Sequence, residues 1–172
     1  AADEDRTVAL ESSGSLHTGQ EAPFFAAWTP DNRVVNLPTL KADRTAAGHV
    51  LSFFSTSCKP CRKGLEMLAR SRDRLKQARI QVLLVAYIAP SDGPEEEARV
   101  VPYLAALGLT SEKVVLDRFG KVSEAYGAVL DGGNKVSLPR TVVLDASARV
   151  RAIFWTEGAD YIDRIVSALG SK

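Results

Sequence analysis

One stretch of this sequence, around its only two cysteines, restricts the possible folds more than any other. It begins with an apolar, aromatic-rich run, Val50 to Phe54, which is typical of a strand buried on both faces. Hydroxyl residues follow at positions 55–57, where side-chain oxygens suit the N-cap of a helix. Cys58 and Cys61 come next, with Pro60 in a first helical turn that tolerates its missing N–H. The stretch therefore predicts a buried strand, a polar turn and a helix that begins at the cysteines.

The spacing of the two cysteines favours redox chemistry. If Cys58 opens the helix, Cys61 lies about one turn further on the same face, close enough to form a disulfide. The free N–H groups of a helix start stabilise a thiolate, and Lys59 and Arg62 add positive charge. We therefore expect the pKa of Cys58 to lie below about 8.5, the usual value of a free thiol. Cys58 would then form a mixed disulfide with a partner, and Cys61 would resolve it.

Other uses of the cysteines fit the sequence less well. A purely structural bridge would not need the strand–turn–helix context. A zinc site needs four ligands, and the only histidines, His17 and His49, lie upstream without finger spacing. A peroxidatic cysteine would want a Thr three residues before it and a Pro seven before it, but these positions hold Ser55 and Leu51.

Length and composition fit a single globular domain. The chain has 172 residues, of which 45% are hydrophobic, and this is enough for a sizeable core. Its net charge of +1 gives no reason to expect nucleic acid or an anionic membrane surface as a partner. The longest apolar run, Val82 to Ala89, is shorter than a membrane span and suits a buried strand. The sequence begins Ala1-Ala2-Asp3 without Met, which is compatible with an export signal removed before residue 1.

Strand and helix patterns alternate along the chain and predict an α/β fold with one central sheet. Residues 1–18 are polar and irregular, and we expect a flexible leader followed by one domain at 19–172. Two short apolar runs around Pro30-Asp31-Asn32 predict a β-hairpin. The other expected elements are a helix from Cys58 to about Lys76, a strand at 82–88, a helix from Gly93 that Pro102 kinks or splits, a strand at 113–116, a helix at 121–126, a loop at 127–138, antiparallel strands at 140–145 and 150–155, and a closing helix through Leu169.

The order of these motifs resembles the thioredoxin superfamily, and within it the TlpA/ResA-like extracytoplasmic thiol–disulfide oxidoreductases. The resemblance begins at Gly19 and reaches the C-terminus. It rests on a hairpin segment with Ala22-Pro23-Phe24, on the segment Val50 to Cys61, and on Leu138-Pro139 at the head of a strand. It implies a thioredoxin-like fold with a central mixed β-sheet flanked by helices, an N-terminal β-hairpin, and a βα insertion at residues 90–116.

The same resemblance implies a function. Similar proteins exchange disulfides with protein substrates and need no cofactor beyond the redox-active Cys58–Cys61 pair. A cis bond before Pro139 would lie against the cysteines, with its neighbouring backbone pairing with the substrate. We therefore expect a monomeric enzyme that reduces protein disulfides outside the cytoplasm. The sequence is also compatible with an electron donor in the membrane and with a membrane anchor that was lost before residue 1. The implied site residues are the catalytic Cys58 and Cys61, with Leu138, Pro139, Lys59 and Pro60 in supporting roles.

Several positions depart from the family pattern. Thioredoxins have a buried Asp six residues before the first cysteine, where this chain has Ser52, and the usual Trp before that cysteine is Ser57. ResA-like members often carry a Glu three residues after the second cysteine, where this chain has Gly64. The nearest carboxylate in sequence, Glu66, points elsewhere on the predicted helix. We therefore expect no ionisable group beneath Cys61, and the proton acceptor for its thiol stays unassigned.

Alternative functions and roles stay open at this point. Two thiolates can hold Cu(I), so a copper-handling or purely binding thioredoxin-like module is one alternative, although no Met or His lies beside them in sequence. A thiol peroxidase is the alternative enzyme. The loop at 127–138 is longer than the family usually shows and is expected on the active-site side, where it either shapes partner choice or forms a solvated hairpin.

Overall fold

A computed structural model describes residues 16–170 of the chain. Its centre is a seven-stranded mixed sheet in the order β2-β1-β5-β4-β3-β8-β9. These strands are β1 Ala26–Trp28, β2 Val34–Asn36, β3 Gly48–Phe54, β4 Ile80–Tyr87, β5 Lys113–Asp117, β8 Arg140–Asp145 and β9 Val150–Phe154. A separate two-stranded sheet joins β6 Val129–Leu130 to β7 Lys135–Val136.

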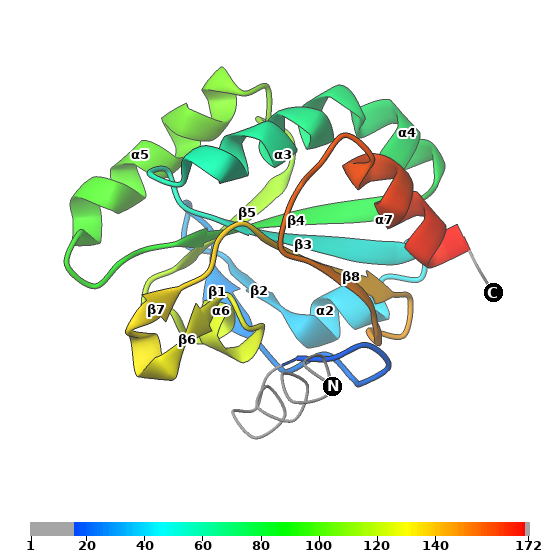
Figure 1. The fold of residues 1–172 in the computed structure, drawn as a ribbon, viewed down its shortest axis with the longest axis horizontal. Helices are drawn as coiled ribbons and strands as arrows, with labels where there is room; N and C mark the ends of the chain where they lie inside the picture. The colour runs from blue at the N-terminus through cyan, green and yellow to red at the C-terminus, as the bar shows by residue number, and fades with distance from the viewer. Residues whose placement is uncertain (1–15, 171–172) are drawn as a thin grey trace, which may run out of the picture.

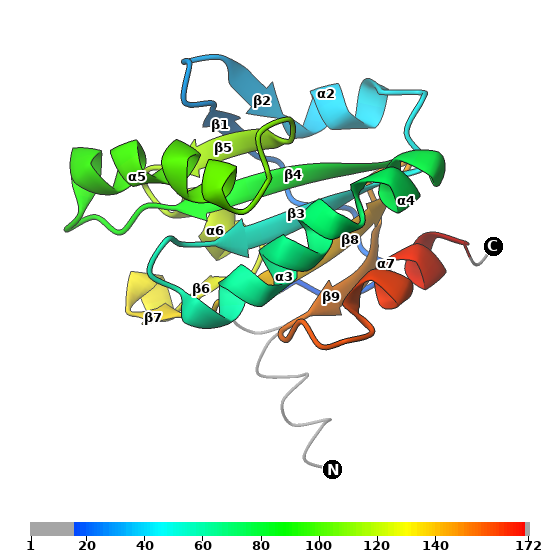
Figure 2. The same cartoon turned by 90° about the horizontal axis from the view of Figure 1, so that it is seen from above.

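Helices cover both faces of the large sheet, as Figures 1 and 2 show. One face carries α3 Lys59–Arg70, α4 Arg72–Gln77, α5 Gly93–Ala106 and α7 Tyr161–Gly170. The other face carries α2 Leu37–Ala42 and α6 Lys121–Ala125. This arrangement of one mixed sheet between two helical layers confirms the predicted α/β fold with an N-terminal hairpin.

Strand β3 lies in the middle of the sheet and is buried along its whole length. It runs parallel to β4 and antiparallel to β8. Because side chains alternate along a strand, Val50 and Phe54 enter the apolar core under α3 and α7, whereas Leu51 and Phe53 enter the core on the opposite face. Ser52 is also buried, and by the same alternation it faces α3 and α7.

Two of the predicted helices differ in the structure. The helix expected from Cys58 to Lys76 is two helices, α3 and α4, which meet at Ser71. Helix α5 runs through Pro102, so this residue does not split the helix, and the alternative expectation of a kink stays a prediction. Pro102 removes one N–H donor, but both it and Ala98, whose carbonyl loses that donor, are exposed, so water can satisfy the carbonyl. The segment at 127–138 is not a plain loop, since it contains β6, a short turn of 3₁₀ helix and β7.

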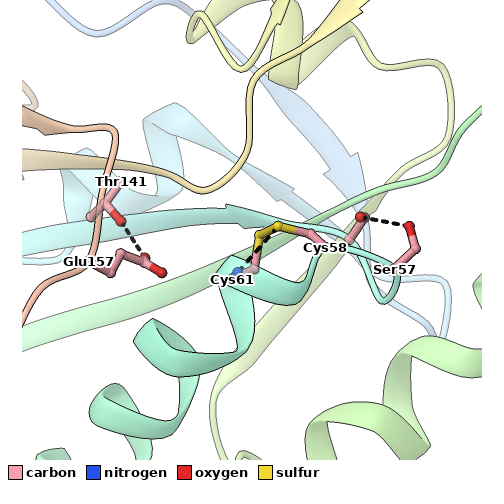
Figure 3. Close-up of a disulfide and its surroundings, with 6 residues drawn as sticks. Ser57, Cys58, Cys61, Thr141 and Glu157 are labelled. Carbon is pink, nitrogen blue, oxygen red and sulfur yellow. Dashed lines mark hydrogen bonds between the residues drawn. A yellow bond between two sulfur atoms is a disulfide. The ribbon is translucent and has the colours of Figure 1, made fainter.

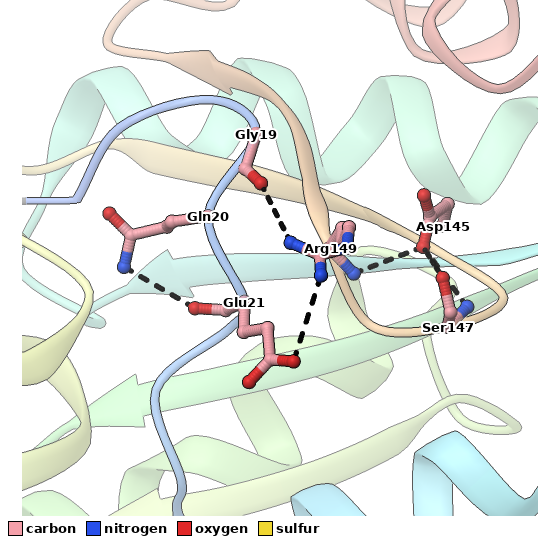
Figure 4. A network of polar contacts seen from close by, with 6 residues as sticks. All are labelled: Gly19, Gln20, Glu21, Asp145, Ser147 and Arg149. Carbon is pink, nitrogen blue, oxygen red and sulfur yellow. Dashed lines mark hydrogen bonds and ion pairs between the residues drawn. The ribbon is translucent and has the colours of Figure 1, made fainter.

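The chain ahead of β1 is fixed to the turn between β8 and β9, as Figure 4 shows. Arg149 donates from Nη1 to the carbonyl of Gly19 over 3.1 Å and forms an ion pair with Glu21 at 3.7 Å. Asp145 holds the turn from the other side, accepting from the backbone N–H of Arg149 at 3.0 Å. Most of the predicted leader, residues 1–18, lies outside the described residues, and Leu16 near its end is buried.

Candidate active site

The two cysteines lie at the junction of β3 and α3 and are joined by a disulfide (Figure 3). Cys58 is the N-cap of α3, and Pro60 lies in the first turn, as the sequence predicts. The Cα atoms of the pair are 5.4 Å apart, and the backbone N–H of Cys61 points to Sγ of Cys58 over 3.3 Å. A thiolate on Cys58 would therefore meet a backbone donor and the positive end of the helix dipole, which both lower the pKa of a thiol.

The two sulfurs have different access to solvent. Cys61 is only 1% exposed and belongs to the apolar core with Leu65 and Leu68. Cys58 is partly exposed and packs against the edge of the same core. The prediction that Cys58 is the more exposed sulfur is therefore confirmed. Lys59 is also exposed, so water screens its charge from the thiol.

The peptide bond between Leu138 and Pro139 is cis, as the sequence analysis predicts. Pro139 is buried, and Leu138 is partly buried against the core cluster that contains Cys61 and on which Cys58 also packs. The pairing of β8 with β3 explains this arrangement, because it brings the residues ahead of β8 to the end of the sheet where β3 runs into α3. Contact between these two residues and a substrate backbone stays a prediction.

Between the sheet and the α3–α7 layer lies a group of four buried polar residues, here called the buried polar cluster: Ser52, Thr141, Glu157 and Tyr161. The hydroxyl of Thr141 donates to Oε2 of Glu157 over 3.1 Å and lies 2.8 Å from the hydroxyl of Tyr161 (Figure 3). Ser52 also forms a hydrogen bond with Tyr161. Oε1 of Glu157 has no hydrogen-bond partner among the described residues. The cluster thus contains one acid with an unsatisfied oxygen inside an apolar core.

Burial changes the acidity of this cluster. Loss of solvent raises the pKa of Glu157 from 4.5 to about 7, although hydrogen bonds with Thr141 and Tyr161 act in the opposite direction. Burial also raises the pKa of Tyr161 well above its usual value of 10, so this phenol stays protonated at neutral pH. Glu157 is therefore the member of the cluster that changes charge near neutral pH.

The carboxylate of Glu157 occupies the space beside Gly64 on α3. A Cβ atom at position 64 would collide with the carboxylate carbon and both oxygens of Glu157. The expectation that no ionisable group lies near Cys61 is therefore wrong, because Gly64 is one helical turn beyond that cysteine. Glu66 is not this group, since it is partly exposed and forms an ion pair with Arg62 at 3.7 Å.

Sequence reasoning missed Glu157 because the residue lies in the loop between β9 and α7, almost one hundred positions after the cysteines. The only indication in the sequence is indirect. Gly64 stands where similar proteins often carry a Glu, and a helix interior gains nothing from glycine unless another group needs the space.

The small hairpin of β6 and β7 lies at the end of the sheet where α3 begins, as Figures 1 and 2 both show. Its residues from Asp131 to Val136 are exposed. The guanidinium of Arg140 fixes the chain ahead of this hairpin, because it is buried and donates from Nε to the carbonyl of Tyr126 over 2.9 Å. The hairpin is thus a solvated element on the active-site side of the molecule.

Within residues 16–170, no three or more His, Cys, Asp or Glu side chains gather in a way that could hold a metal ion. Within the same residues, no helix combines the length and the apolar character that a membrane crossing requires.

Comparisons with known proteins agree with this geometry. The AhpC/TSA family matches residues 18–153 of the chain. The thiol-disulfide oxidoreductase ResA of Bacillus thuringiensis subsp. konkukian is 22% identical over 135 residues, which cover 78% of this chain and 68% of that protein.

Solved structures show the same fold. A putative thiol:disulfide interchange protein DsbE from Chlorobium tepidum is 24% identical, has a TM-score of 0.69, and matches 90% of this chain and 99% of its own. The thioredoxin domain of a thiol-disulfide oxidoreductase from Bacteroides vulgatus is 17% identical, with a TM-score of 0.68 and the same coverage. The chain thus belongs to the AhpC/TSA family, has a thioredoxin-like fold, and is a thiol–disulfide oxidoreductase built around the Cys58–Cys61 pair.

Proposed function

We propose that this oxidoreductase reduces disulfides in protein substrates outside the cytoplasm. The observation that carries this proposal is the asymmetry of its disulfide, with Cys58 partly exposed at the helix start and Cys61 buried behind it. A sulfur that reaches the surface can attack a partner, and a sulfur that is buried is protected from partners until the mixed disulfide has formed.

The exchange proceeds in two steps that start from the reduced pair. The thiolate of Cys58 attacks one sulfur of the substrate disulfide, forms a mixed disulfide and releases the other substrate sulfur as a thiolate, which takes up a proton. Cys61 then loses its proton, attacks Sγ of Cys58 and releases the second substrate thiolate. Two electrons have passed from the protein to the substrate, and the Cys58–Cys61 disulfide seen in the structure remains.

Leu138 and Pro139 are proposed as the docking surface for the substrate. The cis bond lies immediately before β8, and Leu138 packs on the core cluster that contains Cys61 and on which Cys58 also packs. Backbone groups at this bend could pair with an extended substrate segment while Cys58 attacks its sulfur. Lys59 and Pro60 are exposed in the first turn of α3 and complete the rim around the nucleophile.

A trapping experiment tests this reading. Cys61→Ser retains the attacking thiol but cannot resolve the mixed disulfide, so it should accumulate covalent complexes with its substrates that dithiothreitol releases. Cys58→Ser is the matched control and should trap none. Complexes that form equally well through Cys61 alone would contradict the assigned roles.

The direction of the reaction is tested by its reduction potential. A reductant should equilibrate near the value of thioredoxin, about −270 mV, whereas a value near that of DsbA, about −120 mV, would make the protein an oxidant. The extracytoplasmic location is supported by the resemblance to TlpA/ResA-like proteins, and fractionation of cells that express the native gene tests it.

A further inference from the structure

We propose that Glu157 is the proton acceptor for the thiol of Cys61 when this thiol resolves the mixed disulfide. This role presupposes the exchange reaction proposed above and adds a residue from a distant part of the chain to it. The carboxylate comes from the loop between β9 and α7. Helix α3 has a glycine, Gly64, at the position beside it, and the missing side chain leaves room for this carboxylate.

The placement of the carboxylate supports this assignment. Because Glu157 fills the Cβ site of Gly64, its position relative to Cys61 follows from helix geometry. Side chains three residues apart on a helix lie about 5–6 Å from each other, and each Cα–Cβ bond tilts toward the helix N-terminus. The carboxylate therefore lies one turn from Cys61 and on its side of the helix, at a distance that the thiol and one water molecule can bridge. Figure 3 shows the side chain of Glu157 extending toward this turn of α3.

The surroundings of Glu157 leave one oxygen available for a proton. Oε2 accepts from the hydroxyl of Thr141 on β8, whereas Oε1 has no partner among the described residues although Glu157 is only 8% exposed. A buried carboxylate oxygen without a donor is costly to maintain, which indicates that it serves a purpose. The thiol of reduced Cys61, one turn before Gly64 on the same side of α3, is the donor that we assign to this oxygen.

Other groups that face Glu157 do not compete for the role. Tyr161 of α7 stays protonated near neutral pH, and Thr141 and Ser52 carry hydroxyls that do not ionise. Glu157 takes part in none of the ion pairs found among the described residues. The guanidinium of Arg140 is directed to the carbonyl of Tyr126 instead.

The chemistry of the resolving step needs such a group. The buried thiol of Cys61 gives up its proton reluctantly, because an apolar surrounding disfavours the thiolate. In the proposed step the proton moves to the carboxylate of Glu157, the sulfur of Cys61 forms a bond to Sγ of Cys58, and the bond between Cys58 and the substrate sulfur breaks. The protonated carboxyl then returns the proton to solvent or to the departing thiolate. A pKa of about 7 matches an acceptor that works near neutral pH.

A stopped-flow experiment separates this step from the first one. The reduced protein is mixed with a symmetrical nitrobenzoate disulfide, which releases one coloured thiolate when Cys58 attacks and a second when Cys61 resolves the mixed disulfide. Because this leaving thiolate needs no proton near neutral pH, the second release reports the loss of the Cys61 proton. Wild type, Glu157→Gln and Glu66→Gln are compared across a pH series, with Glu66→Gln as the control for loss of a carboxylate on α3.

Glu157→Gln should slow the second release about 100-fold or more at pH 7, the scale expected for removal of a general base. It should also remove the inflection near pH 7 from the pH profile of that release, while the first release and both releases of Glu66→Gln stay unchanged. The double variant Gly64→Glu/Glu157→Ala moves the carboxylate onto the helix and should recover most of the lost rate.

An unchanged second release in Glu157→Gln would overturn the assignment. A slower release with an unchanged pH profile would also overturn it, since that pattern indicates a structural role. A folded double variant that recovers no rate would contradict the geometry. Absence of the first release in wild type would instead reject the exchange roles of the cysteines, so the two failures are distinguishable.

Discussion

The two ends of one disulfide lie in different surroundings. Around Cys58 the features are local in sequence and face water: a helix N-terminus, an exposed Lys59 and Pro60. Around Cys61 the residues are buried: Ser52 on β3 faces α3, Gly64 lies one helical turn further along α3, and Glu157 comes from the far end of the chain. Two identical side chains thus have different surroundings, and this difference supports the two roles proposed for them, attack by Cys58 and resolution by Cys61.

The largest expected effect is on the cysteines themselves. Cys58→Ser should lower the turnover of a protein disulfide by at least about 10³-fold, because the only other cysteine of the chain, Cys61, is buried. Cys61→Ser should also lose turnover but should keep the first attack on the substrate. Turnover and single-exchange assays on the two variants test the comparison. Equal loss of the first attack in both variants would remove the distinction between the two ends.

Ionisation of the buried Glu157 should lower the free energy of unfolding. Its pKa is raised from 4.5 in the unfolded chain to about 7 in the folded one, so the folded state binds its proton more tightly. The stability associated with this proton is fully present below pH 4.5 and is lost as pH rises through 7. Glu157→Gln, which cannot ionise, should therefore unfold like wild type at pH 4 and be more stable by about 3 kcal/mol at pH 8.

Urea denaturation of both proteins at the two pH values measures this difference. Glu66→Gln is again the control, since its exposed ion pair contributes about 0–1 kcal/mol. The prediction fails if the difference in free energy of unfolding between wild type and Glu157→Gln is the same at pH 4 and pH 8. That result would show that the carboxylate is more accessible to water than its burial indicates.

The close contact between Gly64 and the carboxylate of Glu157 predicts a smaller effect on stability. Gly64→Ala places a methyl group against the carboxylate of Glu157 and should destabilise the fold by about 1–3 kcal/mol, as overpacking does. Gly170→Ala on α7 is the control, because among the described residues no atom outside its chain neighbours and its own helix backbone lies within 4 Å of the added methyl group. Adding Glu157→Ala to Gly64→Ala should relieve most of the loss. Chemical denaturation checks all three variants, and a Gly64→Ala protein as stable as the Gly170→Ala control would place the carboxylate elsewhere.

The sequence predicts the surroundings of Cys58 well and those of Cys61 poorly, for a physical reason. The burial of β3 and the helix start at Cys58 follow from local patterns of apolar residues and caps, whereas the cis bond at Pro139 is predicted only by the resemblance to thioredoxin-like proteins. The contact between Glu157 and Gly64 depends on how α7 and its preceding loop pack on α3, which no local pattern specifies. The break at Ser71 was missed for a similar reason, since the sequence there continues to favour helix.

The smallest expected effect is at Lys59. Its side chain is exposed, and exposed charge pairs contribute about 0–1 kcal/mol, so Lys59→Ala should raise the pKa of the Cys58 thiol by less than about one unit. The ultraviolet absorbance of the thiolate against pH measures the shift in a Cys61→Ser background. A shift well above one unit would show that this end of the disulfide is shielded from water after all.

The most direct test of the division between the two ends is a carbon NMR titration of Glu157. Protein labelled with ¹³C at the glutamate carboxyls is titrated in the oxidised and the reduced state, and the Glu157→Gln variant identifies the signal. In the oxidised protein the carboxyl should titrate in one step near pH 7, as its burial requires. In the reduced protein it should titrate in two steps, because a carboxyl and a thiol that share a proton titrate as a coupled pair. A single step at the same pH in both redox states would contradict the account.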